Sequence, residues 1–310
     1  MKHYLKPSIL LFVFAIVNNA KEIKAQKTPE SLGWKLGVQT YSFRLFTFEE
    51  ALNKADSIGI KYVQGFPGQK IGAGIEGTMD YHMPASKRDS VLQLLKKKNI
   101  AIVSYGVVTP KTEDDWKQLF EFAKGMGLKQ FASEPEPEFI PLVSKLADQY
   151  KINVALHNHP RPSRYWSPDT LTKYTKGYSK RLGACADIGH WVRSGLDPVN
   201  MLKKLQGRIF ELHVKDLHEK PSAEYAAFLL SRPLPGQSAQ AQGARNQAPS
   251  GPHDVPWGTG VSNIKMVLEE LRRQGFKGSL FAEYEYNWNN NAPEIAESIK
   301  YVKEVVKKMK

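Results

Sequence analysis

The sequence predicts an α/β protein of the (β/α)₈, or TIM-barrel, class, with one barrel domain spanning residues 30–310. The chain has 310 residues, of which 41% are hydrophobic, and single barrels of this class commonly reach this length. Eight short apolar segments alternate with segments of helical pattern, which favours a barrel or a doubly wound sheet. The count of eight favours the barrel. No Gly-x-Gly-x-x-Gly motif follows the first segment, which disfavours a nucleotide-binding open sheet.

The eight apolar segments are the predicted strands. Segments this apolar suit strands that are buried on both faces of a parallel sheet. Several of them end abruptly in a polar residue, which marks the carboxyl end of the strand. The predicted strands lie at residues 35–42, 62–66, 100–105, 129–134, 152–157, 183–187, 209–213 and 279–283.

The segments between the strands carry signals that start helices. Thr47–Glu50 has the spacing of a capping box, in which two side chains satisfy the first free amides of a helix. Ser167 and Asp197 each precede a proline, which favours a capping residue followed by the first helical position. Near the carboxyl terminus, apolar residues repeat at the spacing of one helical face: Ile295, Ile299, Val302 and Val306.

Residues 1–25 form a predicted signal peptide that is separate from the barrel. Lys2 and Lys6 precede the apolar run 9–17, and the small residues Ala20 and Ala25 offer two cleavage positions. The run is shorter than the roughly 20 residues that a membrane-spanning helix needs. No cysteine lies near these positions to carry a lipid. We therefore expect an exported, periplasmic protein with no stable membrane anchor.

Charge and cysteine content restrict the function classes further. The formal net charge is +13, but the lysines are scattered along helical segments, which indicates a solvated surface rather than a nucleic-acid-binding patch. Cys185 is the only cysteine, so no intrachain disulfide can form. It lies in an apolar run and is expected to pack in the core rather than to act as a nucleophile.

A long loop at about residues 218–260 interrupts the alternation after the seventh strand. Its middle is low in complexity, as in Gln237–Ala244, and its end reads His253–Gly260. Loops of this length are usually functional or disordered. Because this one leaves the carboxyl end of a strand, we expect it to lie over the active face of the barrel.

Acidic and imidazole side chains follow five successive predicted strands. In a barrel, the carboxyl ends of the strands meet at one mouth, where the catalytic residues of such enzymes lie. Several carboxylates buried together would repel one another and lose their hydration, and a divalent cation removes this cost. These side chains are Glu134 after the fourth strand, His157 and His159 after the fifth, Asp187 and His190 after the sixth, His213, Lys215 and Asp216 after the seventh, and Glu283 and Glu285 after the eighth.

The pattern predicts one divalent metal ion at the mouth. Mixed imidazole and carboxylate ligands suit Mn, Co, Fe, Zn or Mg, and the sequence does not choose among them. His159 and Glu285 are expected to orient ligands rather than to bind the metal. Whether Glu134 or His157 completes the ligand set is left open. The predicted metal ligands are Glu134, His157, Asp187, His213 and Glu283.

Over residues 35–308 the chain resembles the xylose isomerase-like barrels, which include sugar isomerases, ketohexose 3-epimerases and inosose dehydratases. The resemblance depends on Asp187-x-x-His190, His213–Asp216, Val255–Gly260 and Glu283 at the end of the last strand. It implies that Asp187, His213 and Glu283 bind a metal. It also implies that His190 and Lys215 contact a small carbohydrate substrate.

The sequence departs from this family at the fifth strand. The epimerases carry a glutamate there that binds metal and acts as a base, whereas this chain has His157. Glu134 could restore a carboxylate; otherwise Glu283 is the remaining carboxylate base and His157 or His159 carries the second proton. The candidate catalytic residues are Glu134, His157, Glu283 and Lys215.

The resemblance implies proton abstraction next to a carbonyl, with the metal stabilising an enediolate. Return of the proton gives an isomerase or epimerase. Loss of a leaving group from the same intermediate gives the alternative, a lyase or hydrolase that cleaves 3-keto-glycosides. A third hypothesis is a barrel that binds sugar without catalysis. The candidate substrate-binding residues are His159, His190, Lys215 and four aromatic residues that could stack on sugar rings: Tyr41, Phe66, Tyr105 and Trp257.

Nucleic acid is not an expected partner. The related endonuclease IV-type enzymes bind three zinc ions with ligands from the first strands as well. In this chain those strands end in Ser42, Phe66 and Tyr105, which are not metal ligands of that kind. The sequence leaves open whether the protein assembles into a homo-oligomer.

Overall fold

The computed structural model describes residues 27–232 and 249–309. The predicted signal peptide and the low-complexity stretch Gln237–Ala244 lie outside the described residues. Within the described residues, no helix is both long and apolar enough to cross a membrane.

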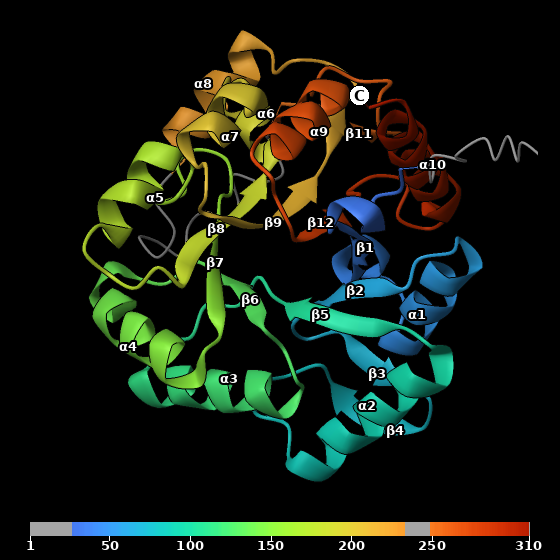
Figure 1. The fold of residues 1–310 in the computed structure, drawn as a ribbon, viewed down its shortest axis with the longest axis vertical. Helices are drawn as coiled ribbons and strands as arrows, with labels where there is room; N and C mark the ends of the chain where they lie inside the picture. The colour runs from blue at the N-terminus through green and yellow to red at the C-terminus, as the bar shows by residue number, and fades with distance from the viewer. Residues whose placement is uncertain (1–26, 233–248, 310) are drawn as a thin grey trace, which may run out of the picture.

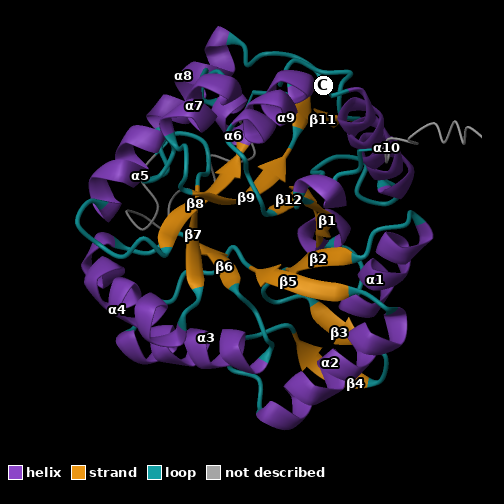
Figure 2. Ribbon diagram, in the orientation of Figure 1, coloured by secondary structure: helices purple, strands orange, loops and turns teal. Residues whose placement is uncertain are grey.

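Eight parallel strands form the centre of the molecule, with helices around them (Figures 1 and 2). They follow the order β5-β2-β1-β12-β9-β8-β7-β6, and a parallel bridge between Val108 and Ser133 joins the two ends of this sheet. The prediction of a (β/α)₈ barrel is confirmed. The strands are β1 (Lys35–Gln39), β2 (Tyr62–Gly65), β5 (Ala101–Tyr105), β6 (Gln130–Ser133), β7 (Asn153–His157), β8 (Leu182–Asp187), β9 (Ile209–Val214) and β12 (Ser279–Ala282).

Three helices begin at the positions that the sequence signals. Thr47 and Glu50 form the predicted capping box, and the side chains of Ser167 and Asp197 accept amide hydrogens at the starts of their helices. The larger helices are α1 (Phe48–Ser57), α2 (Ala85–Lys98), α3 (Glu113–Gly125), α4 (Ile140–Tyr150), α5 (Pro168–Thr175), α6 (Ile188–Arg193), α7 (Pro198–Lys204), α8 (Ala223–Ser231), α9 (Ile264–Arg273) and α10 (Ala292–Lys308).

The hydrophobic core lies between the barrel and its surrounding helices. The apolar stripe predicted for the last helix is buried there, and it shares the core with Val38 and Leu280 of neighbouring strands. Burial of these faces stabilises the fold by about 25 cal/mol for each Å² of apolar surface removed from water. The stripe consists of Ile295, Ile299, Val302 and Val306.

Short helices and strand pairs lie in the segments outside the barrel strands and the larger helices. Among the described residues, 3₁₀ helices occur at η1 (Glu30–Leu32), η2 (Thr40–Phe43) and η3 (Pro137–Phe139), and η2 ends the first strand earlier than residue 42, where the sequence placed it. Two antiparallel pairs join β3 (Lys70–Gly72) to β4 (Ile75–Thr78) and β10 (Asp216–Leu217) to β11 (Asp254–Val255).

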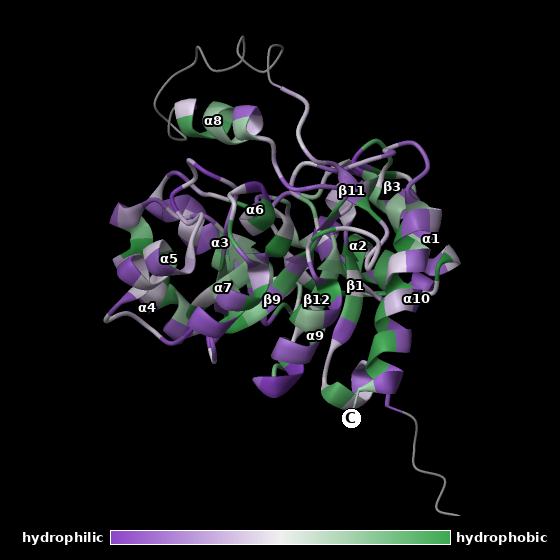
Figure 3. Cartoon of the chain, turned by 90° about the horizontal axis from the view of Figure 1, so that it is seen from above, coloured by the Kyte–Doolittle hydropathy of each residue, from purple (hydrophilic) through white to green (hydrophobic). Residues whose placement is uncertain are grey.

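A pair of short strands joins the two described ends of the long loop. The β10–β11 pair fixes both ends, and Figure 3 places α8 outside the barrel on the same side as β11. Of the residues of α8, only Leu229 is buried. The loop therefore leaves and rejoins the barrel beside the strand ends that carry the predicted site.

Candidate active site and metal centre

Four predicted metal ligands come together at the carboxyl ends of four adjacent strands. His157 and Asp187 end β7 and β8, His213 lies near the end of β9, and Glu283 follows β12. These strands are neighbours in the barrel, and Asp187 is in register with His213. One ligand-type atom from each residue lies within 4.8 Å of the others, and all four side chains are buried.

These four residues point polar atoms at one another. His213 Nδ1 lies 2.9 Å from Glu283 Oε2, and Asp187 Oδ2 lies 3.6 Å from His157 Nε2. Within the described part of the chain, none of these four atoms has a well-aligned hydrogen bond, although both carboxylate oxygens form ion pairs with Lys215. Buried polar atoms are rarely left without one, so the group has the donor set and the unmet bonding capacity of a divalent-cation site.

The Asp187 side chain is aimed by its local fold. It caps helix α6, because its Oδ1 accepts the backbone N–H of His190 at 2.8 Å. The Asn158 side chain bonds both the N–H and the C=O of Asp187, at 2.9 and 2.8 Å. The remaining oxygen, Oδ2, is left to face the group.

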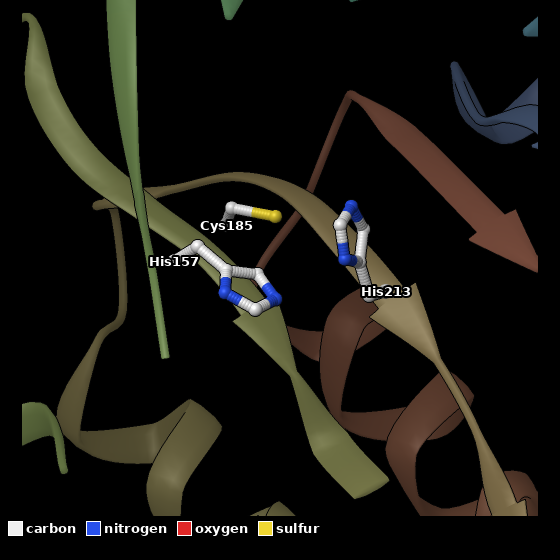
Figure 4. A group of neighbouring side chains, drawn as sticks. All are labelled: His157, Cys185 and His213. Atoms are coloured by element: carbon white, nitrogen blue, oxygen red, sulfur yellow. The ribbon is translucent and has the colours of Figure 1, made fainter. Parts of the chain in front are cut away.

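Cys185 also lies beside the two imidazole rings, as Figure 4 shows. Its thiol is fully buried. Burial and the negative charge of Glu211 raise the pKa of this thiol well above its usual value. A thiol ligand must lose its proton, so Cys185 is a poorer ligand than the carboxylates of Asp187 and Glu283. The prediction that it packs in the core is confirmed.

Lys215 places a buried ammonium among the carboxylates. Its Nζ lies 2.8 Å from Glu283 Oε2, 3.2 Å from Asp187 Oδ2 and 3.1 Å from Glu285 Oε2. Burial opposes the charged form, but these carboxylates outweigh it and raise the pKa of Lys215. In turn, and against burial, the Lys215 ammonium holds the pKa of Glu283 well below its usual value. Glu283 is thus kept as a carboxylate.

Glu134 differs from the four ligand residues because its hydrogen bonds are complete. Oε1 meets Nδ1 of both His157, at 3.0 Å, and His159, while Oε2 accepts from Ser163 at 3.2 Å. Against burial, the two imidazoles hold the pKa of Glu134 below its usual value. Burial likewise opposes the charge on His157, but Asp187 and Glu134 raise its pKa to about 10. The geometry therefore favours His157 as the fourth ligand and Glu134 as the group that orients it.

A second layer of charge links the site to the long loop. Arg193 lies 3.2 Å from Glu285 and 3.5 Å from Asp254 of β11, and Glu285 in turn contacts Lys215. His190 Nε2 lies 3.5 Å from Asp187 Oδ2. Burial and the positive charges of Lys215 and Arg193 keep the pKa of His190 well below its usual value, so a neutral ring faces the site.

A cavity of about 200 Å³ adjoins this group. A larger groove of about 670 Å³ is lined by residues of α9 and α10 and contains none of the predicted site residues. The smaller cavity is therefore the one that contacts the predicted site residues. Its lining consists of Gln39, Tyr41, Phe66, Val107, His159, His190, Glu283 and Glu285.

Two of the four predicted aromatic contacts require correction, and the predicted contact Lys215 is likewise not among the residues that line this cavity. Tyr105 is fully buried, packs against Phe122 and bonds the carbonyl of Met79. Trp257 is 2% exposed and belongs to the hydrophobic core. Neither lines the cavity, whereas Tyr41 and Phe66 do.

Two buried amides below the ligand group were not predicted from the sequence. Gln64 on β2 is fully buried, and its Oε1 lies 2.6 Å from His213 Nε2. Gln39 on β1 bonds the same oxygen at 2.8 Å. The available signal was a glutamine inside each of two strands that are otherwise largely apolar.

Comparison with known proteins identifies the family. The family model for the xylose isomerase-like TIM barrel matches residues 52–305. The structure of an uncharacterised protein from Parabacteroides distasonis has a TM-score of 0.65 and 30% sequence identity, covering 88% of this chain and 99% of that chain. No match is found among curated proteins.

Two further solved structures share the fold at lower identity. A D-tagatose 3-epimerase-like protein has a TM-score of 0.62 and 18% identity, over 88% of this chain and 98% of that chain. A xylose isomerase-like TIM-barrel protein from Mycobacterium smegmatis, in complex with magnesium, has a TM-score of 0.61 and 14% identity, over 88% and 97%. The family match, with the Parabacteroides protein, shows that the chain belongs to the xylose isomerase-like TIM-barrel family.

Proposed function

We propose that this protein is a metal-dependent sugar isomerase or epimerase that moves a proton next to a carbonyl group of a small carbohydrate. One observation carries the proposal: four buried ligand-type atoms without well-aligned hydrogen bonds converge beside a cavity that Glu283 and His159 both line. Membership of the xylose isomerase-like family supports a carbohydrate substrate.

The proposed ligands of one divalent cation are His157 Nε2, Asp187 Oδ2, His213 Nδ1 and Glu283 Oε2. Two imidazoles and two carboxylates suit Mn, Co, Fe, Zn or Mg. When bound, the cation supplies a Lewis acid that stabilises the negative charge developing on the substrate oxygens. The magnesium complex of the mycobacterial neighbour supports a hard cation here.

Two residues on different sides of the mouth can carry protons. Glu283 is kept ionised by Lys215 and can accept a proton from carbon. His159 follows β7, three strands away from β12, and is held through Nδ1 by Glu134. Its other nitrogen is left for the substrate. When one residue removes a proton from a carbon and the other donates a proton to its opposite face, that carbon is inverted. When a proton is donated instead to the former carbonyl carbon, and the neighbouring hydroxyl proton moves to the former carbonyl oxygen, the sugar is isomerised.

A second candidate is elimination from a 3-keto-glycoside. The observation that favours it is the exposure of His159, whose side chain is 51% accessible at the rim. An imidazole at this position can give its proton to a departing alcohol that leaves directly for solvent. Glu283 would act as the base in either reaction.

Solvent deuterium separates these reactions. Protein loaded with Mn²⁺ or Co²⁺ would be incubated in D₂O with a panel of ketoses and 3-keto-glycosides, and the products followed by NMR and mass spectrometry. Deuterium incorporation without cleavage is the expected result. Incorporation with release of the aglycone would replace the isomerase by the lyase. Binding with no exchange from any substrate would instead favour the non-catalytic sugar-binding barrel.

We further propose that the protein is exported, on the evidence of the basic and apolar residues 1–25. Amino-terminal sequencing of protein from the periplasmic fraction is expected to begin after Ala20 or Ala25. Retention of Met1 in the folded protein would refute the proposal.

A further inference from the structure

A column of buried polar side chains runs through the barrel interior below the ligand group. Gln39, Gln64 and Ser104 come from β1, β2 and β5, and Glu211 comes from β9 on the other side of the barrel. All four are at most 1% exposed. None of them can bind a substrate directly from this depth except Gln39, which reaches the cavity. Their shared feature is that they are hydrogen-bonded to one another.

Two backbone groups fix the orientation of the Gln39 amide. Its Oε1 accepts the N–H of Tyr41 at 3.1 Å, and its Nε2 donates to the carbonyl of Gly106 at 2.5 Å. A backbone N–H only donates and a backbone C=O only accepts, so the oxygen and nitrogen of this side chain cannot be exchanged.

The Gln39 orientation determines that of Gln64. Gln39 Nε2 donates its second hydrogen to Gln64 Oε1 at 2.8 Å, so the atom of Gln64 at this position must be the acceptor. Gln64 Nε2 then donates to Glu211 Oε1 at 2.7 Å and to Ser104 Oγ at 3.0 Å. Both hydrogens of the Gln64 amide are used, and the whole side chain is held in one orientation.

The Gln64 orientation determines where His213 carries its proton. His213 Nε2 lies 2.6 Å from the same Gln64 Oε1. Because that oxygen can only accept, Nε2 must donate, and in a neutral ring Nδ1 then carries no hydrogen. This bare Nδ1 is the atom that faces Glu283 Oε2 at 2.9 Å without a hydrogen-bond partner among the described residues.

We propose that Gln64 is a positioning residue that selects the His213 tautomer with a bare Nδ1 and so presents its lone pair to the divalent cation. Gln39 and Glu211 hold Gln64 in place from either side. The inference rests on the metal site proposed above, and it assigns a role to a buried residue of the half of the barrel that supplies no ligand. Partners of this kind fix the orientation and basicity of metal-binding histidines.

The tautomer can be observed without metal or substrate. In metal-free protein labelled with ¹⁵N at histidine, at a pH where the ring is neutral, the His213 nitrogens are expected to show Nε2 bonded to hydrogen and Nδ1 unbonded. A His213→Gln variant assigns the signals by their loss. The opposite tautomer, or a rapid mixture of the two, would overturn the inference.

The metal affinity of two matched variants provides the second test. Gln64→Met removes the partner of His213 together with the hydrogen bonds of Gln64 to Gln39, Ser104 and Glu211. Gln130→Met also removes a hydrogen bond to Glu211 but leaves His213 bonded to Gln64. Titration with Co²⁺, followed by its visible absorption, is expected to give a Kd 10- to 100-fold higher for Gln64→Met and within about threefold of the unchanged protein for Gln130→Met.

The outcomes separate this inference from the proposed function. Equal loss of affinity in both variants would show that Glu211 packing, and not the His213 tautomer, sets the affinity, and would overturn the inference. Unchanged affinity in Gln64→Met would overturn it as well. Failure of the unchanged protein to bind Co²⁺ would overturn the proposed metal site itself, while the tautomer measurement still decides the orientation of His213.

Discussion

The two halves of the barrel mouth are built from different chemistry. The half formed by β7, β8, β9 and β12 presents ionisable side chains, with Asp187 and Glu283 at its centre. The half formed by β1, β2 and β5 presents amides, a hydroxyl and aromatic rings, including Gln64 and Tyr41. In the first half, ligand atoms are left without hydrogen bonds, whereas the Gln64 amide in the second half uses all of its hydrogens.

This difference shows how a folded chain can keep several ionisable side chains buried close together. Unpaired buried polar atoms oppose folding, so they persist where the surrounding structure fixes them or a ligand satisfies them. The half formed by β1, β2 and β5, here called the neutral half, supplies part of that fixed structure through Gln64. Tyr41 and Phe66 line the cavity at its rim and form an aromatic wall. Damage to the charged half should therefore abolish metal binding, while damage to the aromatic wall should weaken substrate binding alone.

The largest effect is expected for Asp187→Asn. The amide keeps the size of the side chain and can still cap α6, but it removes one of the two proposed anionic ligands. We expect the metal content to fall from about one ion per chain to near zero and the activity to fall about 10³-fold. Elemental analysis after gel filtration measures the first. Glu285→Gln is the matched control, since Glu285 contacts Lys215 but is outside the ligand group; full metal occupancy in Asp187→Asn would refute the ligand assignment.

A smaller effect is expected for the His159→Gln variant. His159 lies at the boundary of the two halves. This variant removes a proton carrier but no proposed ligand. We expect kcat to fall about 10²-fold with the metal content unchanged. Kinetics and elemental analysis on the same sample test this. A parallel loss of metal would mean that His159 belongs to the ligand group, as the alternative cluster of Glu134, His157 and His159 allows.

The charged half could be predicted from the sequence to a large extent. Each of its strands is an apolar run that ends in Asp, Glu or His, and a barrel brings such ends together. The choice between Glu134 and His157 could not be made in this way. It depends on the hydrogen bonds from His157 and Ser163 that satisfy Glu134, and these join residues far apart in sequence.

The neutral half was harder to predict because it depends on side-chain direction. Successive residues of a strand point to opposite faces, so Ser104 in the interior places Tyr105 on the outside, among the helices. Trp257 is drawn into the core by its turn, in which Asp216 accepts the N–H groups of Gly258 and Gly260. Neither the direction of Tyr105 nor the burial of Trp257 can be predicted from composition or from the spacing of residues.

An effect on binding alone is expected for Tyr41→Ala. Tyr41 lines the cavity and packs edge-on against Phe66 at 4.8 Å between ring centroids. Loss of its stacking surface should raise KM about tenfold, equivalent to about 1.4 kcal/mol, and change kcat by less than about threefold. Steady-state kinetics with the substrate found by deuterium exchange test this. A fall in kcat with unchanged KM would place Tyr41 in the chemical step and weaken the contrast between the halves.

The smallest effect concerns pH and the base of the long loop. Burial raises the pKa of Asp254 to about 7, even though Arg193 at 3.5 Å opposes the rise. The folded protein therefore holds a proton there between about pH 4 and 7 that the unfolded chain has released. The contribution of this group to stability is present at low pH and is lost as the pH rises through 7.

The Asp254→Asn variant tests whether ionisation of Asp254 lowers stability as the pH rises, because an amide cannot ionise. The difference in free energy of unfolding between the variant and the unchanged protein should shift in favour of the variant by on the order of 1 kcal/mol from pH 5 to pH 8. Urea denaturation of both proteins at both pH values measures this difference. The amide can still accept the N–H of Glu285, so the gain reflects the charge that is removed. A loss at pH 8 would instead show that the ion pair with Arg193 outweighs burial. The charged half of the mouth would then extend, as a stabilising network, through Glu285 and Arg193 to the loop.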